Sequence, residues 1–200
     1  MTRRVVLASQ SPARLALLRQ AGISPDVVVS GVDESAVTAP RVAELVALLA
    51  TAKARAVAAQ TDDALVIGAD SLLEFRGEPL GKPADAAEAR VRWQRMGGRT
   101  GTLHTGQAVL DVSGGTIAAR DVGVSSTVVH FATPTPEELE AYVGSGEPLH
   151  VAGAFTLDGL GAPFVRRVEG DPSGVVGLSL PLLRTQLARL GVPITDLWSR

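Results

Sequence analysis

The stretch that decides the fold runs from residue 65 to residue 82 and reads LVIGADSLLEFRGEPLGK. An apolar run leads through a glycine and an alanine into the carboxylate of Asp70, and Lys82 follows a short charged turn. A carboxylate in an apolar strand is costly unless a metal, a cation or water compensates its charge. We therefore expect Asp70 and Lys82, on neighbouring strands, to form part of a site for a metal-complexed anion such as a phosphate ester. The alternative is that Asp70 ends a strand and Lys82 is a solvated turn residue.

The composition excludes several classes of protein. The 200 residues are 46% hydrophobic, which is enough for one sizeable core or for one domain with two lobes. The 19 basic and 21 acidic residues nearly balance, so no broad basic surface for duplex nucleic acid is expected. The absence of cysteine excludes disulfides, thiol catalysis and cysteine metal sites. No apolar run approaches the roughly 18 residues of a membrane span, so we expect a cytoplasmic protein.

The hydrophobic pattern predicts strands and helices that alternate in the first half of the chain. The expected strands cover residues 5–8, 27–29, 65–75, 103–112, 122–131 and 164–168. The expected helices cover residues 12–21, 41–60, 85–96, 135–143 and 181–190. Two strands joined by the turn at residues 113–115 form a hairpin. The pattern therefore predicts an α/β fold with a mixed sheet, and no linker divides the chain into independent domains.

The segment SQSPAR, residues 9–14, lies between the first expected strand and the first expected helix. Free backbone N–H groups at a helix start attract anions, Ser9 adds a hydroxyl, and Arg14 adds a forked cation. The alternative is a plain serine-capped helix start. The chain has no Walker-type phosphate loop, no closely spaced histidines and no Gly-x-Ser-x-Gly nucleophile, so a P-loop ATPase, a zinc site and a serine hydrolase lack support.

Two further candidates are the carboxylate pair Asp33–Glu34 and the lysine at position 53. The pair follows a short expected strand and offers oxygen ligands to Mg²⁺ or Mn²⁺. Lys53 lies among alanines on the longest expected helix. For each of them the alternative is a solvated surface residue.

In their order along the chain, these segments resemble the Maf-like nucleoside triphosphate pyrophosphatases, a family also named for an effect on septum formation. The resemblance covers almost the whole chain and implies an elongated, two-lobed mixed sheet with flanking helices and a central cleft, similar to inosine triphosphate pyrophosphatases. It also implies one domain over residues 1–200. The matching segments are residues 7–18, 33–34, 49–54, 67–71, 81–83, 98–100 with 105–106, 152–155 and 175–178.

The resemblance implies hydrolysis of a nucleoside triphosphate to the monophosphate and pyrophosphate with a divalent cation, Mg²⁺ or Mn²⁺. It gives Asp70 the role of the proton acceptor that activates water, and Glu34 and Asp70 the role of metal ligands. The expected partner is the nucleotide, with no nucleic acid and no membrane, and a homodimer is one assembly to test. The residues expected to hold the phosphates are Ser9, Arg14, Lys53 and Lys82.

The chain departs from the family pattern at three positions that the family associates with base selection. Ala13 stands where an arginine is usual, Ser71 where threonine is frequent, and Asp158 where glutamine is frequent. We expect Ser71 and Asp158 to contact the substrate. The departures argue against the dTTP/UTP preference of one subgroup. The sequence at His150 resembles that of the subgroup that acts on N7-methylated GTP. No base is therefore assigned.

Two other functions remain as alternatives. The first is a nucleotide-binding regulator of septum formation whose effect does not need turnover. The second is a nucleotidyltransferase, which would need an acceptor site that the sequence does not reveal. Asp70 and Lys82 favour the enzyme, because a pure binder has no use for a carboxylate beside the α-phosphate. The expected role is therefore removal of modified or surplus nucleotides, with a link to cell-division arrest to be tested.

Overall fold

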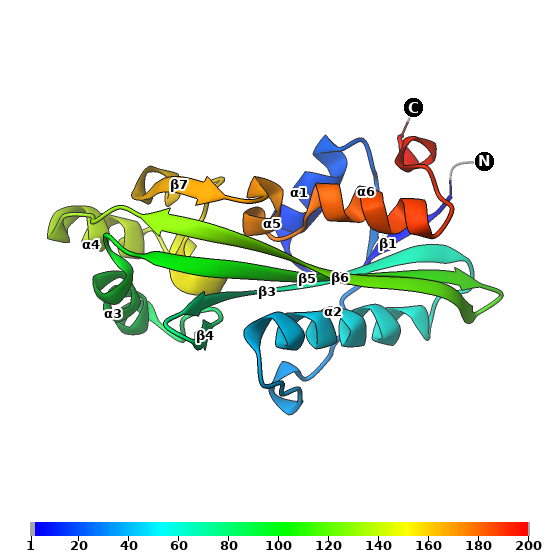
Figure 1. The fold of residues 1–200 in the computed structure, drawn as a ribbon, viewed down its shortest axis with the longest axis horizontal. Helices are drawn as coiled ribbons and strands as arrows, with labels where there is room; N and C mark the ends of the chain where they lie inside the picture. The colour runs from blue at the N-terminus through cyan, green and yellow to red at the C-terminus, as the bar shows by residue number, and fades with distance from the viewer. Residues whose placement is uncertain (1–2, 200) are drawn as a thin grey trace. The chain divides into compact units, whose positions relative to one another are not determined.

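The computed structural model describes residues 3–199, and within them seven strands join one sheet (Figure 1). Their order is β2-β1-β3-β5-β6-β7, with β4 paired to β3 outside this path. β1 runs parallel to β2 and β3, whereas β4 is antiparallel to β3 and β7 to β6, so the predicted mixed α/β fold is confirmed. The strands are β1 (Val5–Leu7), β2 (Asp26–Val27), β3 (Ala64–Phe75), β4 (Glu78–Leu80), β5 (Thr100–Ser113), β6 (Thr116–Phe131) and β7 (Val165–Glu169).

Helices connect these strands. The α-helices of the described chain are α1 (Pro12–Gln20), α2 (Val42–Ala58), α3 (Ala86–Met96), α4 (Pro136–Gly144), α5 (Pro172–Val176) and α6 (Leu180–Arg189). Its short 3₁₀ helices are η1 (Glu34–Ala36), η2 (Glu147–His150), η3 (Ala152–Ala154), η4 (Ala162–Phe164) and η5 (Ile194–Leu197). None of the helices in residues 3–199 is both long enough and apolar enough to cross a membrane.

The longer elements confirm the sequence pattern. The predicted start of α4 is a capping box, in which the Thr135 hydroxyl accepts from the Glu138 N–H and the Glu138 carboxylate accepts from the Thr135 N–H. The predicted hairpin turns at Gly114 and Gly115, whose φ angles of 55° and 72° favour glycine. The predicted strand at residues 27–29 is wrong in extent. β4, α5 and the 3₁₀ helices were not among the predicted ranges.

The chain divides into two compact units. Of the described residues, the first unit holds 3–70, 105–125 and 177–199, and the second holds 71–104 and 126–176. Each unit has its own buried apolar clusters and is described by itself below.

In the first unit, helices cover both faces of the sheet: α1 and α6 lie on one side and α2 on the other (Figure 1). Successive strand residues alternate between the two faces, so Leu7 joins the cluster with Leu18 of α1 while Val6 joins the cluster with Ala54 of α2. This double coverage explains why the strands of this unit read as continuous apolar runs.

Two glycines let α2 approach the sheet closely. A Cβ at Gly68 of β3 would lie 2.8 Å from the Cβ of Ala54 and would collide with the carbonyl oxygen of Ala50, both on α2. A Cβ at Gly106 of β5 would collide with the backbone of Val46. Asp70 follows Gly68 by two residues and therefore points to the same face of β3, toward α2.

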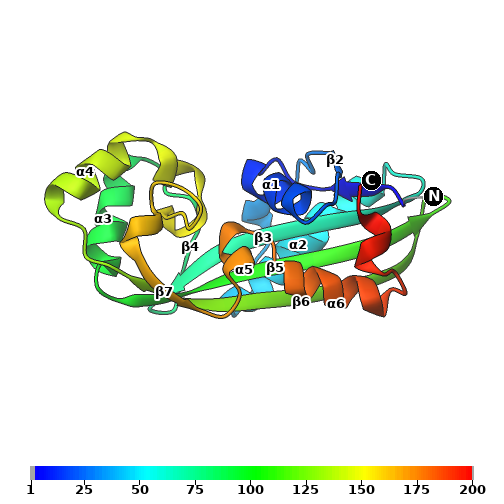
Figure 2. The ribbon, with the colours of Figure 1, turned by 90° about the horizontal axis from the view of Figure 1, so that it is seen from above.

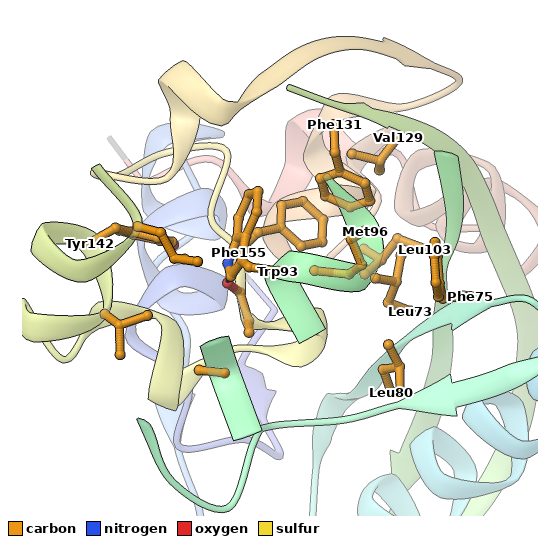
Figure 3. Close-up of a cluster of buried hydrophobic side chains, with 14 residues drawn as sticks. Leu73, Phe75, Leu80, Trp93, Met96, Leu103, Val129, Phe131, Tyr142 and Phe155 are labelled. Atoms are coloured by element: carbon orange, nitrogen blue, oxygen red, sulfur yellow. The ribbon is translucent and has the colours of Figure 1, made fainter. Parts of the chain in front are cut away.

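The second unit is built around the indole of Trp93 on α3 (Figure 3). The ring makes edge-to-face contacts with Phe131, Tyr142 and Phe164, at centroid distances of 5.7, 5.9 and 5.8 Å. Its Nε1–H donates to the carbonyl oxygen of Ala154 at 2.7 Å, so the one polar atom of the ring is satisfied. α3 and α4 pack side by side over this cluster (Figure 2).

Candidate active site

The turn from β1 into α1 fixes a buried guanidinium in the first unit. The Ser9 hydroxyl oxygen accepts hydrogen bonds from Arg14 Nη1 at 3.1 Å and from the Ser11 N–H at 3.2 Å. Arg14 Nε donates to the carbonyl oxygen of Gly177 at 2.8 Å. Gly177 has a φ of 132°, a conformation that L side chains rarely adopt. The structure therefore brings Ser9 and Arg14 together, as expected, and adds Gly177 as the residue that orients the arginine.

A lysine and two carboxylates form the second part of the cluster. Lys53 Nζ lies 2.5 Å from Asp70 Oδ1 and 2.7 Å from Glu34 Oε1. Lys53 and Asp70 are 8% and 6% exposed, so their ion pair is buried, whereas Glu34 is exposed. The alternative reading of Lys53 as a solvated helix residue is therefore wrong.

Asp33 and Glu34, the acidic pair after β2, make different contacts. The Asp33 carboxylate caps η1 by accepting from the Ser35 N–H at 3.0 Å and from the Ser35 hydroxyl at 2.7 Å. These bonds also lower the pKa of Asp33. Glu34, the first residue of η1, is thereby held with its carboxylate on Lys53. The sequence had offered the pair as a unit, and the structure assigns only its second member to the cluster.

The environment shifts the pKa of the central groups. Burial raises the pKa of the Asp70 carboxyl above its ordinary value, and the Glu34 carboxylate adds to this, while Lys53 and Arg14 oppose it. Burial lowers the pKa of Arg14, which Asp70 and Glu34 raise again, and an arginine stays protonated at neutral pH. A carboxylate with a raised pKa is a better proton acceptor than an ordinary aspartate. Asp70 is therefore suited to accept a proton.

The same carboxylates suit a divalent cation. Asp70 and Glu34 both pair with the Lys53 ammonium, so a divalent cation between the two carboxylates would take the place of that contact. In residues 3–199 no three His, Asp or Glu side chains gather as a ready metal site. Mg²⁺ is usually held by one or two carboxylates together with substrate phosphates and water, so two carboxylates fit it.

The second unit contains the remaining predicted residues, Lys82, Ser71 and Asp158. β4 pairs with β3, with Leu80 opposite Leu73, but Lys82 lies two residues beyond β4. The expectation that Lys82 sits on a neighbouring strand is therefore wrong. Lys82 lies in a loop that follows that strand, and its side chain is exposed.

Helix α3 holds this loop on both sides of Lys82. Arg92, a buried arginine that the sequence analysis did not single out, donates from Nη1 to the carbonyl oxygen of Gly81 at 2.5 Å. Glu88 pairs with Arg92 and also accepts from the Ala84 N–H at 2.7 Å. The four-residue spacing of Glu88 and Arg92 on one helix was the available signal.

The positions that the sequence analysis associated with base selection belong to different units. Ala13 is half-buried in α1 of the first unit, and Ser71 is half-buried in β3 of the second. Asp158 is exposed in the loop between η3 and η4, and His150 is exposed at the end of η2. The other two histidines make hydrogen bonds within the second unit, His104 with Ser126 and Glu74, and His130 with Glu169.

The fold of this chain is similar to that of a solved protein. The chain is similar to a solved HAM1 protein from Coxiella burnetii, with a TM-score of 0.53 over 94% of this chain and 99% of that one. Their sequences are 18% identical, so this likeness concerns the fold alone.

Sequence similarity identifies the family as well as the fold. The family model described as "Maf-like protein" matches residues 4–190. The chain is 61% identical to a nucleoside triphosphate pyrophosphatase of Streptomyces coelicolor over 98% of this chain and 95% of that one. It is 53% identical to a protein of the same name from Mycolicibacterium vanbaalenii over 98% and 99% of the two chains. The chain belongs to the Maf-like family.

Proposed function

We propose that this protein is a nucleoside triphosphate pyrophosphatase, which hydrolyses a nucleoside triphosphate to the monophosphate and pyrophosphate. Its similar relatives from Streptomyces coelicolor and Mycolicibacterium vanbaalenii carry that name. The structural observation that carries the proposal is the buried Asp70–Lys53 pair, which combines a proton acceptor with a raised pKa and a cation for phosphate oxygens.

The proposed reaction is an attack of water on the α-phosphorus. Asp70 orients the water and accepts its proton, the new P–O bond forms, and the bond from the α-phosphorus to the oxygen bridging the α- and β-phosphates breaks. Pyrophosphate leaves with that oxygen and its electron pair. Because burial raises the pKa of Asp70, this carboxylate takes the proton more readily than an exposed aspartate would.

Cationic side chains would stabilise the charge that builds on the phosphate oxygens. Lys53 reaches a phosphate by exchanging its bond to Asp70 or Glu34 for one to the substrate. Ser9 and Gly177 fix the orientation of Arg14 in advance, which reduces the ordering that substrate binding requires. Lys82 is proposed as a further phosphate contact, supplied by a loop that α3 restrains.

We also propose that the reaction uses Mg²⁺ or Mn²⁺, held by Asp70 and Glu34. A bound divalent cation would neutralise charge on the phosphate oxygens and on the leaving pyrophosphate. Selection among bases is assigned to Ala13, Ser71 and Asp158. An ionised Asp158 only accepts hydrogen bonds, so it should favour a base that presents N–H donors.

The test is a panel of nucleoside triphosphates with separate detection of pyrophosphate, orthophosphate and monophosphate, with and without EDTA. We expect pyrophosphate and monophosphate in equal amounts from at least one substrate, and none after chelation. Asp62→Asn is the matched control for Asp70→Asn, because Asp62 is an exposed aspartate of the same unit. Orthophosphate alone across the panel would contradict the proposal. Nucleotide binding without any turnover would instead favour the regulator of septum formation. A cytoplasmic location of the protein stays a prediction.

A further inference from the structure

The loop of residues 156–161 in the second unit is built around a carboxylate, that of Glu147. Glu147 Oε1 accepts from the Thr156 hydroxyl at 2.5 Å and from the Gly161 N–H at 3.1 Å. Glu147 Oε2 accepts from the Leu160 N–H at 3.0 Å. The Gly161 N–H also lies 3.0 Å from the Thr156 hydroxyl oxygen, so both ends of the loop converge on one side chain. The carboxylate therefore closes the loop.

The glycines of the loop are required for this closure. A Cβ at Gly159 would lie 2.5 Å from Glu147 Oε2, and a Cβ at Gly161 would lie 2.7 Å from the Thr156 hydroxyl oxygen. Burial works to raise the pKa of Glu147, but the hydrogen bonds from Thr156 and from the N–H groups of Leu160 and Gly161 outweigh it and lower the pKa. Glu147 is thus ionised at neutral pH, and its bonds are charge-assisted.

Glu147, which anchors the loop, lies next to the apolar core of the second unit. Glu147 is the first residue of η2 and is followed by the buried Pro148. Leu149 packs against the same apolar cluster as Tyr142 and Phe155, which Figure 3 shows around Trp93. A loop that is hydrogen-bonded to such a residue should be more rigid than an ordinary surface loop.

The tip of the loop presents two different side chains to solvent. Asp158 offers carboxylate oxygens, and Leu160 is 61% exposed, the largest exposure among the big apolar side chains of the described chain. Neither side chain is buried, so neither contributes burial energy to the stability of the unit. The pair does suit a nucleobase, because an apolar group can cover a base face while a carboxylate accepts from N–H groups on its edge.

We propose that Glu147 is a positioning residue for base selection, which sets the place of Asp158 and Leu160 by closing the loop of residues 156–161. The inference rests on the proposed pyrophosphatase function and extends it to a residue outside the catalytic cluster. Glu147 acts through the loop, and it is not proposed as a contact to the substrate phosphates. Its loss should alter which triphosphate is preferred, and should leave phosphate binding unchanged.

The experiment compares wild type with two variants that open the loop from opposite sides. Glu147→Gln keeps the size of the side chain but replaces one acceptor oxygen with an amide donor. Gly159→Ala leaves Glu147 in place but drives a methyl group into its Oε2. Glu137→Gln is the control, because Glu137 is an exposed glutamate on α4. Three quantities are measured: kcat/KM across the triphosphate panel, inhibition by inorganic tripolyphosphate, which has no base, and amide hydrogen exchange of the loop.

We expect both loop variants to reduce the kcat/KM ratio between the best and the second-best triphosphate by about tenfold, equivalent to about 1.4 kcal/mol. The change should appear in KM more than in kcat, and tripolyphosphate inhibition should change by less than about twofold, because phosphate contacts are common to all substrates. The amides of Leu160 and Gly161 should exchange faster, and Glu137→Gln should match wild type in every measurement.

Several results would overturn the inference. An unchanged kcat/KM ratio between the best and the second-best triphosphate, despite faster exchange, would show that the loop does not select the base. An equal loss for all triphosphates and for tripolyphosphate would assign Glu147 to phosphate binding or to overall stability. Should Gly159→Ala fail to fold, Glu147→Gln decides alone. A wild-type protein that releases no pyrophosphate would refute the proposed function, whereas an active wild type whose kcat/KM ratio is unaltered in Glu147→Gln refutes only this inference.

Discussion

The two members of the buried ion pair of the first unit should differ in how much their substitution destabilises the protein. Lys53→Met removes the cation nearest to Asp70 and leaves that carboxylate 6% exposed without its 2.5 Å partner. Asp70→Asn, by contrast, leaves Lys53 with a second carboxylate, because Glu34 lies 2.7 Å away on the exposed side. Loss of the lysine should therefore be the more destabilising change.

The size of the effect follows from the burial of the pair. Removing one member of a buried ion pair costs about 3–5 kcal/mol, because the other charge stays behind uncompensated. For a chain of 200 residues this corresponds to a fall of about 6–20 °C in the midpoint of thermal unfolding. The pKa of Asp70 is already raised by burial, and loss of Lys53 raises it further. The cost is therefore present above the unfolded-state pKa of about 3.9 and disappears as acid protonates Asp70.

The assay is thermal unfolding by circular dichroism from pH 4 to pH 8. Arg55→Met is the matched control, since Arg55 is an exposed cation on the same helix, α2. We expect Lys53→Met to unfold well below wild type at pH 7 and to approach it at pH 4, with Arg55→Met close to wild type throughout. Equal midpoints for the two variants at pH 7 would refute the reasoning, because Lys53 would then contribute no more than a surface cation.

Three further predictions concern activity. Asp70→Asn should lower kcat by about 10²-fold or more and keep or raise the unfolding midpoint at pH 7, because the raised pKa of Asp70 means that its charge opposes folding; near-normal turnover would make Asp70 a structural residue. Lys82→Ala should weaken every triphosphate by one common factor, roughly 10- to 150-fold for a charge-assisted contact of about 1.5–3 kcal/mol, measured as kcat/KM; a loss confined to some bases would contradict a phosphate contact. Asp158→Gln should change the ranking of substrates more than the rate on the best one, and a uniform loss would move Asp158 to the phosphate or metal site.

Periodicity predicted the elements that carry Lys53 and Asp70, and it did so for a physical reason. α2 and β3 are long enough for the periods of 3.6 and 2 to be read, and the small residues Gly68, Ala50 and Ala54 show where the two can meet. The pairing of Lys53 with Asp70 follows from that contact. The partner of Arg14 could not be predicted this way, because Gly177 lies 163 residues away and offers only a carbonyl oxygen. The spacing of Glu88 and Arg92 indicates a pair on one helix, but Arg92 was missed because sequence does not distinguish a buried arginine of such a pair from a solvated one.

The two units also differ in how far sequence can determine a side chain's place. Ser9, Arg14, Lys53 and Asp70 are buried, so the packing of α1, α2 and β3 fixes them, and the chemistry common to all triphosphates needs such fixed groups. Lys82 and Asp158 are exposed on loops, and their places depend on a few hydrogen bonds. Arg92 donates one to the Gly81 carbonyl oxygen, and the carboxylates of Glu88 and Glu147 accept others from the backbone N–H groups of Ala84 and Leu160. Loops of this kind can change their tips while the core persists. Substitutions that redirect base choice should therefore occur at residues 156–161 and at Glu147 as well as at Ala13 and Ser71, and those that abolish hydrolysis should concentrate in the buried cluster.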